Sequence, residues 1–255
     1  MIVAGIDIGS ITAEAVLLEG EKILAAVILP TGANSRKAAE RSLNAALEKA
    51  GLPREAPSKI VTTGYGRASF PQATKMITEI TCHARGAFFI HPRTRTVIDI
   101  GGQDSKVIRL DEKGRNVDFQ MNDKCAAGTG RFLEVMAHAL EVRLEDLGQL
   151  SLRAQRTIKI SSTCTVFAET EVVSLIADNQ PKDVIIRGLH ESIADRILGL
   201  VQRVGLEETV ALTGGVAKND GVVQALESRL KVKLFIPPEP QIIGALGAAL
   251  IARDL

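Results

Sequence analysis

Hydrophobic residues in the first part of the chain follow two periods, one typical of strands and one typical of helices. Apolar runs separated by glycine or charged turns predict strands over Ile2–Ile8, Ala13–Leu18, Ile23–Leu29 and Ile60–Thr63. Apolar residues spaced three and four apart predict a helix over Ser35–Ala50, and Gly51 just past its end favours a stop there. A second helix is expected over Thr78–Phe89.

The same pattern restarts in the second part of the chain. Strands are predicted over Thr96–Ile100, Lys106–Leu110, Val117–Met121 and Val210–Thr213, and helices over Gly130–Leu140, from near Phe167, over Pro181–Val204 and over Ile242–Arg253. A strand, an aspartate, a glycine turn, two strands and a helix occur in that order around both Ile6 and Ile98, which indicates an internal duplication. We expect a first half at residues 1–90, a second half at residues 91–239, and a last helix in residues 240–255 that packs back on the first half.

Composition and charge narrow the classes of protein to which the chain can belong. The 255 residues are 45% hydrophobic and 24% charged, which is typical of a folded protein rather than a disordered one. The 31 basic and 30 acidic residues give a net charge of +1, so composition offers no case for binding nucleic acid or an anionic membrane. The longest apolar stretches, such as Ile242–Ala252, are shorter than the roughly 20 residues of a transmembrane helix, and the first residues do not resemble a signal peptide. We therefore expect a cytoplasmic protein.

Three glycine turns that follow predicted strands carry the first candidate chemistry. They are Asp7–Thr12 (DIGSIT), Asp99–Asp104 (DIGGQD) and Leu212–Asn219 (LTGGVAKN). Glycine has no Cβ and adopts positive φ readily, so backbone N–H groups in such turns can surround phosphate oxygens. A carboxylate beside the turn can hold Mg²⁺, usually through its waters. Two such turns at equivalent points of a duplicated unit, with a third late in the chain, predict a nucleotide site.

This set of turns resembles the phosphate-1, phosphate-2 and adenosine motifs of the superfamily of actin, heat-shock chaperones and sugar kinases. The resemblance covers the whole chain and implies an α/β actin-like ATPase fold, in which two ribonuclease-H-like halves close over ATP or ADP. It implies that Asp7 and Asp99 face each other across the cleft near Mg²⁺, with Gln103 and Asp104 as further catalytic candidates. Asp104 would either position the attacking water or cap its turn. The nucleotide-binding residues implied are Gly9, Ser10, Ile11, Thr12, Gly101, Gly102, Gly128, Gly130, Gly214, Gly215, Val216, Asn219 and Gly244.

Two of the three cysteines occupy an unusual position for buried structural thiols. Cys125 and Cys164 each lie in a small, polar segment a few residues before a predicted helix. A helix N-terminus lowers the pKa of a thiol and favours an anionic group, so both are candidate metal ligands. Two thiolates per chain cannot complete a [4Fe–4S] cluster, but a two-fold dimer would supply four, and a zinc ion fits the same count. Cys82 lies within a predicted helix and is expected to be a buried structural thiol, with His83 as a surface or packing residue.

The segments around the cysteines carry a second resemblance. KCAAGTGRF at Lys124–Phe132, SSTCTVFAE at Ser161–Glu169 and TEITCHARGA at Thr78–Ala87 resemble segments of the ATP-dependent activators of 2-hydroxyacyl-CoA dehydratases. That family includes the ATPase subunits of benzoyl-CoA reductases and the reductases of double-cubane cluster proteins. The resemblance implies an oxygen-sensitive homodimer with one [4Fe–4S] cluster, held by Cys125 and Cys164 of each chain. It implies that ATP hydrolysis drives a low-potential electron onto an iron–sulfur partner, a dehydratase or a double-cubane protein, with ferredoxin or flavodoxin as the donor.

Two other functions of the same fold stay open from the residues alone. A small-molecule kinase, such as an amino-sugar kinase, could use Asp104 as its base but would leave the two cysteines unexplained. A filament-forming or scaffold ATPase with a structural zinc would also fit the cysteine count. For the electron-transfer function, the face beside Asn122–Gly128 and Thr163–Glu169 is the expected docking surface for the partner.

Overall fold

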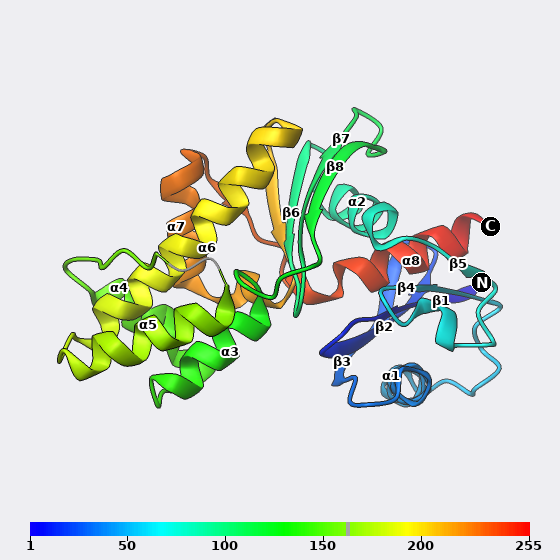
Figure 1. Cartoon of the computed structure of the whole chain (residues 1–255). Coiled ribbons are helices and arrows are strands. Elements are labelled where there is room, and N and C mark those ends of the chain that lie inside the picture. The colour runs from blue at the N-terminus through cyan, green and yellow to red at the C-terminus, as the bar shows by residue number, and fades with distance from the viewer. Residues whose placement is uncertain (162–163) are drawn as a thin grey trace.

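The structure, a computed structural model, describes residues 1–161 and 164–255, and its first sheet is a mixed sheet with the strand order β3-β2-β1-β4-β5 (Figure 1). Strands β1, β2 and β3 form an antiparallel meander, and β4 pairs with β1 in parallel. The strands are β1 (Ile2–Ile8), β2 (Thr12–Glu19), β3 (Lys22–Pro30), β4 (Lys59–Thr63) and β5 (Lys75–Met76).

The second sheet repeats this arrangement strand for strand. Its order is β10-β9-β6-β7-β8, with β6, β7 and β8 as the meander and β9 parallel to β6. Read from the meander outward, each strand occupies the place of its counterpart in the first sheet, which confirms the duplication expected from the sequence. The strands are β6 (Thr96–Ile100), β7 (Ser105–Leu110), β8 (Asn116–Asn122), β9 (Val210–Thr213) and β10 (Leu234–Phe235).

The helices agree with the sequence where the hydrophobic pattern is long and differ where it is short. The predicted helices are α1 (Ser35–Ala50), α2 (Glu79–Ile90), α3 (Gly130–Ala139), α5 (Thr165–Ala177), α6 (Lys182–Val204) and α8 (Ile243–Asp254). Two helices without a prediction are α4 (Leu147–Arg153) and α7 (Asp220–Leu230), and four 3₁₀ helices are η1 (Arg67–Ser69), η2 (Leu144–Asp146), η3 (Gly215–Lys218) and η4 (Pro240–Ile242).

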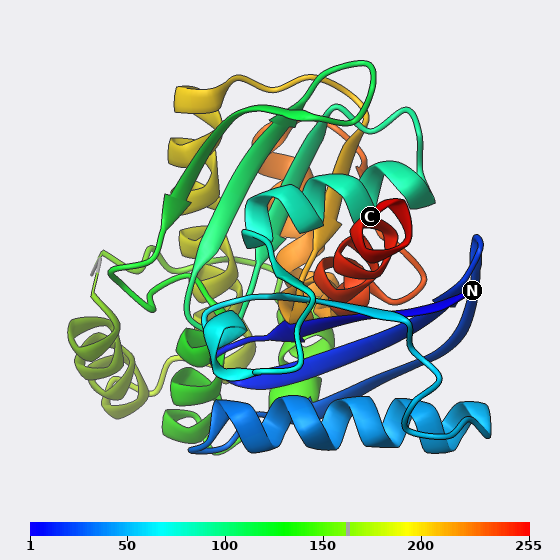
Figure 2. The same ribbon diagram turned by 90° about the vertical axis from the view of Figure 1, so that its right-hand side faces the viewer.

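Helix α1 illustrates how local sequence sets the element boundaries. The Asn34 side chain accepts a hydrogen bond from Lys37 N at the start of the helix, and Gly51 ends it in the left-handed conformation with φ 67°. Alanine and leucine side chains on one face of α1 are buried against β1, β2 and β3, so this helix covers one face of the first sheet (Figure 2).

Helices α2 and α8 form a layer between the two sheets (Figure 1). Small residues make this layer thin: a Cβ on Gly247 would collide with the backbone of Cys82, and one on Gly5 of β1 would collide with the backbone of α8. Cys82 itself is fully buried, and burial raises the pKa of its thiol to about 12, which confirms the predicted structural role. The layer brings α2 side chains to the carboxyl ends of β1 and β6.

Among the described residues, no helix is both long enough and apolar enough to cross a membrane.

Candidate functional site

The turns after β1 and β6 share one backbone hydrogen bond. Gly9 N donates to Thr12 O at 3.0 Å, and Gly101 N donates to Asp104 O at 3.0 Å. A Cβ on Gly9 would lie 2.8 Å from Thr12 O, and a Cβ on Gly101 would lie 2.8 Å from the Asp104 Oδ1 atom. Gly9 therefore approaches backbone too closely for a Cβ, whereas a Cβ on Gly101 would displace the Asp104 carboxylate; the two turns are equivalent in the duplicated units.

Both turns open onto one cleft of about 450 Å³, a size that suits a small-molecule ligand. Of the predicted residues, those that line it are Asp7, Gly9, Ser10, Ile11, Thr12, Asp99, Gly101, Gly102, Asp104, Gly130, Gly214, Gly215, Val216 and Asn219. Gln103, Gly128 and Gly244 do not line it. Gln103 is exposed, and Gly244 lies against Asp7, whose Oδ2 atom a Cβ there would meet. The predicted roles of these three residues stay predictions.

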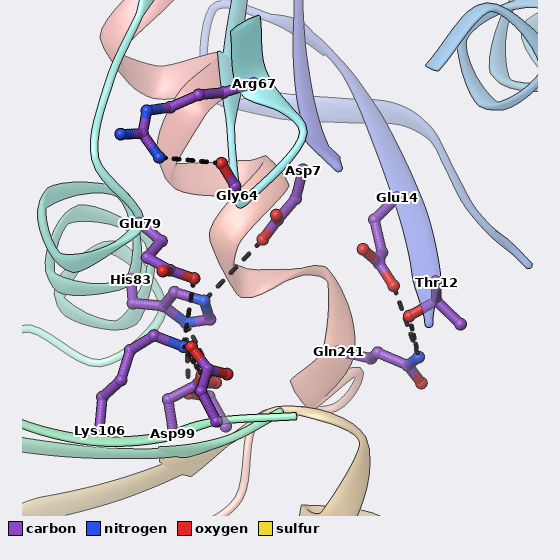
Figure 3. Close-up of polar contacts among 12 residues, drawn as sticks. Asp7, Thr12, Glu14, Gly64, Arg67, Glu79, His83, Asp99, Lys106 and Gln241 are labelled. Atoms are coloured by element: carbon purple, nitrogen blue, oxygen red, sulfur yellow. Dashed lines mark hydrogen bonds and ion pairs between the residues drawn. The ribbon is translucent and has the colours of Figure 1, made fainter. Parts of the chain in front are cut away.

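His83 on α2 stands between Asp7 and Asp99 (Figure 3). Its Nε2 atom lies 3.9 Å from Asp7 Oδ2, and its Nδ1 atom lies 3.3 Å from Asp99 Oδ1. Thr213 Oγ1 also donates to Asp99 Oδ1, at 2.8 Å. Of the two alternatives predicted for His83, the surface position is wrong: the side chain is buried among carboxylates, because α2 is inserted between the sheets.

Lys106 on β7 is the main cation facing the second turn. Its Nζ atom lies 2.7 Å from Asp104 Oδ2, 3.1 Å from Asp99 Oδ2 and 3.2 Å from Glu79 Oε2. Burial alone would lower the pKa of Lys106, but the three carboxylates outweigh it and raise the pKa. Burial would likewise raise the pKa of Asp99, but His83 and Lys106 bring it down to about 2. Lys106 and Asp99 are therefore both charged at neutral pH.

Glu14 on β2 faces the first turn, and within residues 1–161 and 164–255 it forms no ion pair with a cation. It is directly opposite Asp7 in the β1–β2 register and only 4% exposed. The Gln241 amide donates to Glu14 Oε1 at 3.4 Å and to Thr12 Oγ1 at 3.2 Å (Figure 3). Burial, with the nearby Asp7 carboxylate, raises the pKa of Glu14 to about 8. Burial raises the pKa of Asp7 as well, to about 6, although His83 opposes the shift.

The third glycine turn, after β9, also lines the cleft and lies against the end of β6. Gly214 has φ 87°, and a Cβ there would collide with Ile100 O, so this position needs glycine on both counts. Asn219 lines the cleft and also caps α7, since its Oδ1 atom accepts from Gly221 N and Val222 N at 3.1 Å each. Leu133, Leu144 and Val216 add apolar side chains to the lining of the cleft.

The loop that carries Cys125 is hydrogen-bonded to the second glycine turn. Gly130 N donates to Gly101 O at 2.9 Å, and Thr129 Oγ1 donates to Gly102 O at 3.0 Å. The same hydroxyl contacts Ala126 O, next to Cys125, so the buried Thr129 joins the glycine turn to the cysteine loop. The second glycine turn and the backbone beside Cys125 are therefore connected through Thr129.

Both cysteines lie where the sequence placed them, before helices. Cys125 precedes α3, and Cys164 occupies the N-cap position of α5; both side chains are partly exposed. Ser162 and Thr163, which belong to the second cysteine segment and to the expected docking surface, lie outside the described residues. Within residues 1–161 and 164–255, no group of three or more His, Cys, Asp and Glu side chains is arranged to hold a metal ion.

Two buried polar atoms beside the cysteine segments have no hydrogen-bond partner in the described part of the chain, Thr165 Oγ1 and Arg196 Nη2. Thr165 directly follows Cys164. The Arg196 side chain packs against Gly128 in the Cys125 loop, where a Cβ would lie 2.9 Å from Arg196 Cδ. Buried N–H and O–H groups without partners are uncommon and mark positions where a polar group outside the protein chain can bind.

Sequence reasoning missed His83, Glu79, Lys106 and Glu14 as residues of the cleft. Lys106 and Glu14 lie within strands, outside the glycine turns and the cysteine segments from which the candidate residues were taken. One signal was available: in two equivalent hairpins, each is a charged residue with apolar neighbours near the start of the second strand, at a position where a buried charge is unusual. His83 and Glu79 belong to the segment TEITCHARGA. The resemblance of that segment to the dehydratase activators indicated the family but assigned no role to these two side chains.

The chain matches a family model over residues 4–252, described as the BadF/BadG/BcrA/BcrD ATPase family. The chain belongs to this family. It is 52% identical over 255 residues to the activator of lactoyl-CoA dehydratase of Anaerotignum propionicum, covering 100% of this chain and 98% of that one. Members of the BadF/BadG/BcrA/BcrD family are ATPases, so this chain is an ATPase, and membership favours that activity over the amino-sugar kinase alternative.

Two solved structures are similar over nearly their whole length. The activator of the 2-hydroxyisocaproyl-CoA dehydratase from Clostridium difficile, with bound ADPNP, superposes with a TM-score of 0.95 at 48% identity, covering 100% of this chain and 95% of that one. Component A of the (R)-2-hydroxyglutaryl-CoA dehydratase of Acidaminococcus fermentans superposes with a TM-score of 0.96 at 47% identity, covering 100% and 98%. The predicted actin-like ATPase fold is confirmed.

Proposed function

We propose that this chain is an ATP-hydrolysing homodimeric activator, which carries one [4Fe–4S] cluster and delivers a low-potential electron to an iron–sulfur partner enzyme. The partner would be a 2-hydroxyacyl-CoA dehydratase or a double-cubane cluster protein. Relatives named as dehydratase activators support this role over the full length of the chain. The observation that carries the proposal is the hydrogen-bonded connection between the second glycine turn and the Cys125 loop, because it joins an ATP site to a candidate cluster site.

The residues around the cysteines fit an anionic iron–sulfur cluster shared by two chains. Two partly exposed thiols per chain, each before a helix, suit thiolate ligands. The buried, unpartnered Arg196 Nη2 and Thr165 Oγ1 atoms would act as hydrogen-bond donors toward such a group. Cys125 and Cys164 of each chain would hold the cluster, which when bound supplies the electron to be transferred.

The apolar surface of α5 supports the homodimer. Val166, Phe167 and Val173 are 66%, 68% and 54% exposed, although side chains of this kind are normally buried. They belong to the helix that Cys164 begins, so a two-fold dimer around a shared cluster would cover them and bring two copies of each cysteine together. The exposed apolar residues and the cysteines therefore suggest the same interface.

The nucleotide would bind with its phosphates between the first two glycine turns and its adenosine against the third. More carboxylates than cations surround these turns, an arrangement that fits Mg²⁺, with Asp7 and Asp99 holding the ion through its waters. Thr129 would transmit a shift of the second turn to the Cys125 loop and α3. A ferredoxin or flavodoxin would be the donor, and the partner would dock on the face beside Asn122–Gly128.

Iron and acid-labile sulfide analysis of protein purified without oxygen tests the proposal. We expect about four of each per dimer, the content of one cubane. Cys125→Ser and Cys164→Ser should each abolish the cluster and electron transfer, with ADP affinity nearly unchanged. Cys82→Ser is the matched control, because its thiol is buried away from the loops, and it should keep full iron. Zinc in place of iron, or full iron in Cys125→Ser, would contradict the proposal.

A further inference from the structure

Lys106 holds a position that the ATPase activity does not by itself explain. Lys106 is 1% exposed and lines the cleft, and its ammonium forms ion pairs with three different carboxylates and a hydrogen bond to Asp99 Oδ2. A buried ammonium so completely engaged is not available as a simple binding group for phosphate. Its N–H groups instead determine where those carboxylates point.

The orientation of Asp104 depends on Lys106. The Oδ2 atom of Asp104 accepts from Lys106 Nζ at 2.7 Å and from Tyr65 Oη at 3.3 Å. The Oδ1 atom is turned the other way and lies over Gly101 Cα, 2.8 Å from the point that a Cβ there would occupy. Lys106 therefore leaves one carboxylate oxygen of Asp104 directed at the turn predicted to surround the phosphates.

Lys106 also connects Asp104 to helix α2. Glu79 lies in the first turn of α2, and its carboxylate is 3.2 Å from Lys106 Nζ. Since α2 lies between the sheets, this contact fixes the Asp104 carboxylate relative to the layer that also carries His83. Asp99, 3.1 Å from the same ammonium, is held at the other side of the turn.

We propose that Lys106 is a positioning residue for ATP hydrolysis, which orients the Asp104 carboxylate so that Oδ1 accepts a hydrogen bond from the attacking water. The water oxygen forms a bond to the γ-phosphorus, the bond from that phosphorus to the β,γ-bridging oxygen breaks, and ADP and phosphate leave, with the water proton passing to phosphate. Because phosphoryl transfer depends mainly on positioning and electrostatics, the angle of Asp104 matters more than its basicity. The proposal requires the ATPase activity of the family and not the cluster.

A double-mutant cycle on ATP hydrolysis tests the proposal. Asp104→Asn and Lys106→Met should each lower kcat by about 10²-fold, the usual effect of misplacing a positioning group. If Lys106 acts through Asp104, the double variant should be no more than about 3-fold slower than Asp104→Asn. Lys113→Met, an exposed lysine on the β7–β8 turn, is the control and should hydrolyse ATP normally. If kcat of the double variant fell by the product of the two single-variant factors, Lys106 would act independently of Asp104, and the proposal would be overturned.

Lys106→Arg separates orientation from charge and avoids leaving three buried carboxylates without a cation. A planar guanidinium keeps the charge but cannot place its N–H groups as an ammonium does. We expect ADP affinity, measured by calorimetry, to stay within about 3-fold of wild type while kcat falls at least 10-fold. Full kcat in Lys106→Arg, or a raised KM with unchanged kcat in Lys106→Met, would assign Lys106 to charge compensation and overturn the proposal.

Discussion

The hairpins β1–β2 and β6–β7 have the same backbone and opposite electrostatics. In each, an aspartate is the next-to-last residue of the first strand, and a charged residue stands opposite it in the second: Glu14 opposite Asp7, and Lys106 opposite Asp99. The first pair joins two acids and the second joins an acid to a base. Consequently burial raises the pKa of Asp7 to about 6, whereas His83 and Lys106 overcome the effect of burial on Asp99 and lower its pKa to about 2.

The difference extends to the parallel strands β4 and β9. Thr63 on β4 stands opposite Asp7, and Thr213 on β9 stands opposite Asp99. Thr213 Oγ1 donates to Asp99, whereas within residues 1–161 and 164–255 Thr63 Oγ1 makes no hydrogen bond to Asp7 and lies beside the Cys82 thiol instead. Duplication has kept the strand register while the side chains diverged. The second turn is a satisfied, charged network, and the first has unbalanced acids that are suited to an incoming cation.

Replacing each aspartate with asparagine should give the largest difference in folding stability between the two hairpins. Asp99→Asn places an amide against the Lys106 ammonium and should destabilise the nucleotide-free protein by about 3–5 kcal/mol at pH 8, the usual cost of breaking a buried ion pair. Asp7→Asn removes a buried charge whose one ion pair in the described part of the chain is the 3.9 Å contact with His83, so stability should stay the same or rise by up to about 2 kcal/mol. Urea unfolding of both variants, with unchanged m-values, measures the difference.

An equal loss in the free energy of unfolding in Asp99→Asn and Asp7→Asn would contradict the asymmetry of the hairpins. Both variants should bind the cluster yet hydrolyse Mg·ATP poorly, since both aspartates are proposed to hold Mg²⁺. Stability and turnover therefore report separate properties of each aspartate.

The next largest expected effect is on the pH dependence of folding stability, and it comes from Glu14. Its pKa is about 8 in the folded protein, against an ordinary value of 4.5, so between these pH values the folded state keeps a proton that the unfolded state has lost. Folding stability should therefore fall as pH rises through this window, by an amount on the order of a few kcal/mol, and level off above pH 8. Glu14→Gln should flatten the decline in Tm between pH 5 and pH 9 in metal-free buffer.

The control for Glu14→Gln is Glu48→Gln, an exposed glutamate on α1, which should leave the pH dependence unchanged. Asp7 contributes a decline of the same sign between its ordinary 3.8 and about 6, so some slope should remain at the acid end in Glu14→Gln. A profile identical to wild type would mean that Glu14 is ionised in the folded protein.

Sequence reasoning reached the hairpins and their glycine turns because those features are local. Apolar runs, DxG turns and helix spacing depend on neighbours along the chain, and the Cys125 and Cys164 segments were identified in the same way. The role of His83 was not accessible, because it depends on α2 lying between the two sheets, which no local pattern specifies. Helix α4 was missed because it has only 7 residues, and helix α7 was missed because Asn219, which caps it, had been assigned to the nucleotide alone.

The smallest expected difference in stability is between variants of the two threonines, Thr213 and Thr63. Thr213→Val removes a hydrogen bond to a charged, buried carboxylate and should cost about 1.5 kcal/mol, while Lys106 and His83 keep Asp99 ionised. Thr63→Val replaces a buried hydroxyl that makes no bond to Asp7 with a methyl of similar size, so stability should be unchanged or slightly higher. Urea unfolding resolves a difference of this size between the two variants. A comparable loss in both would mean that Thr63 supports Asp7 as Thr213 supports Asp99, and the two hairpins would then differ only in the charge opposite each aspartate.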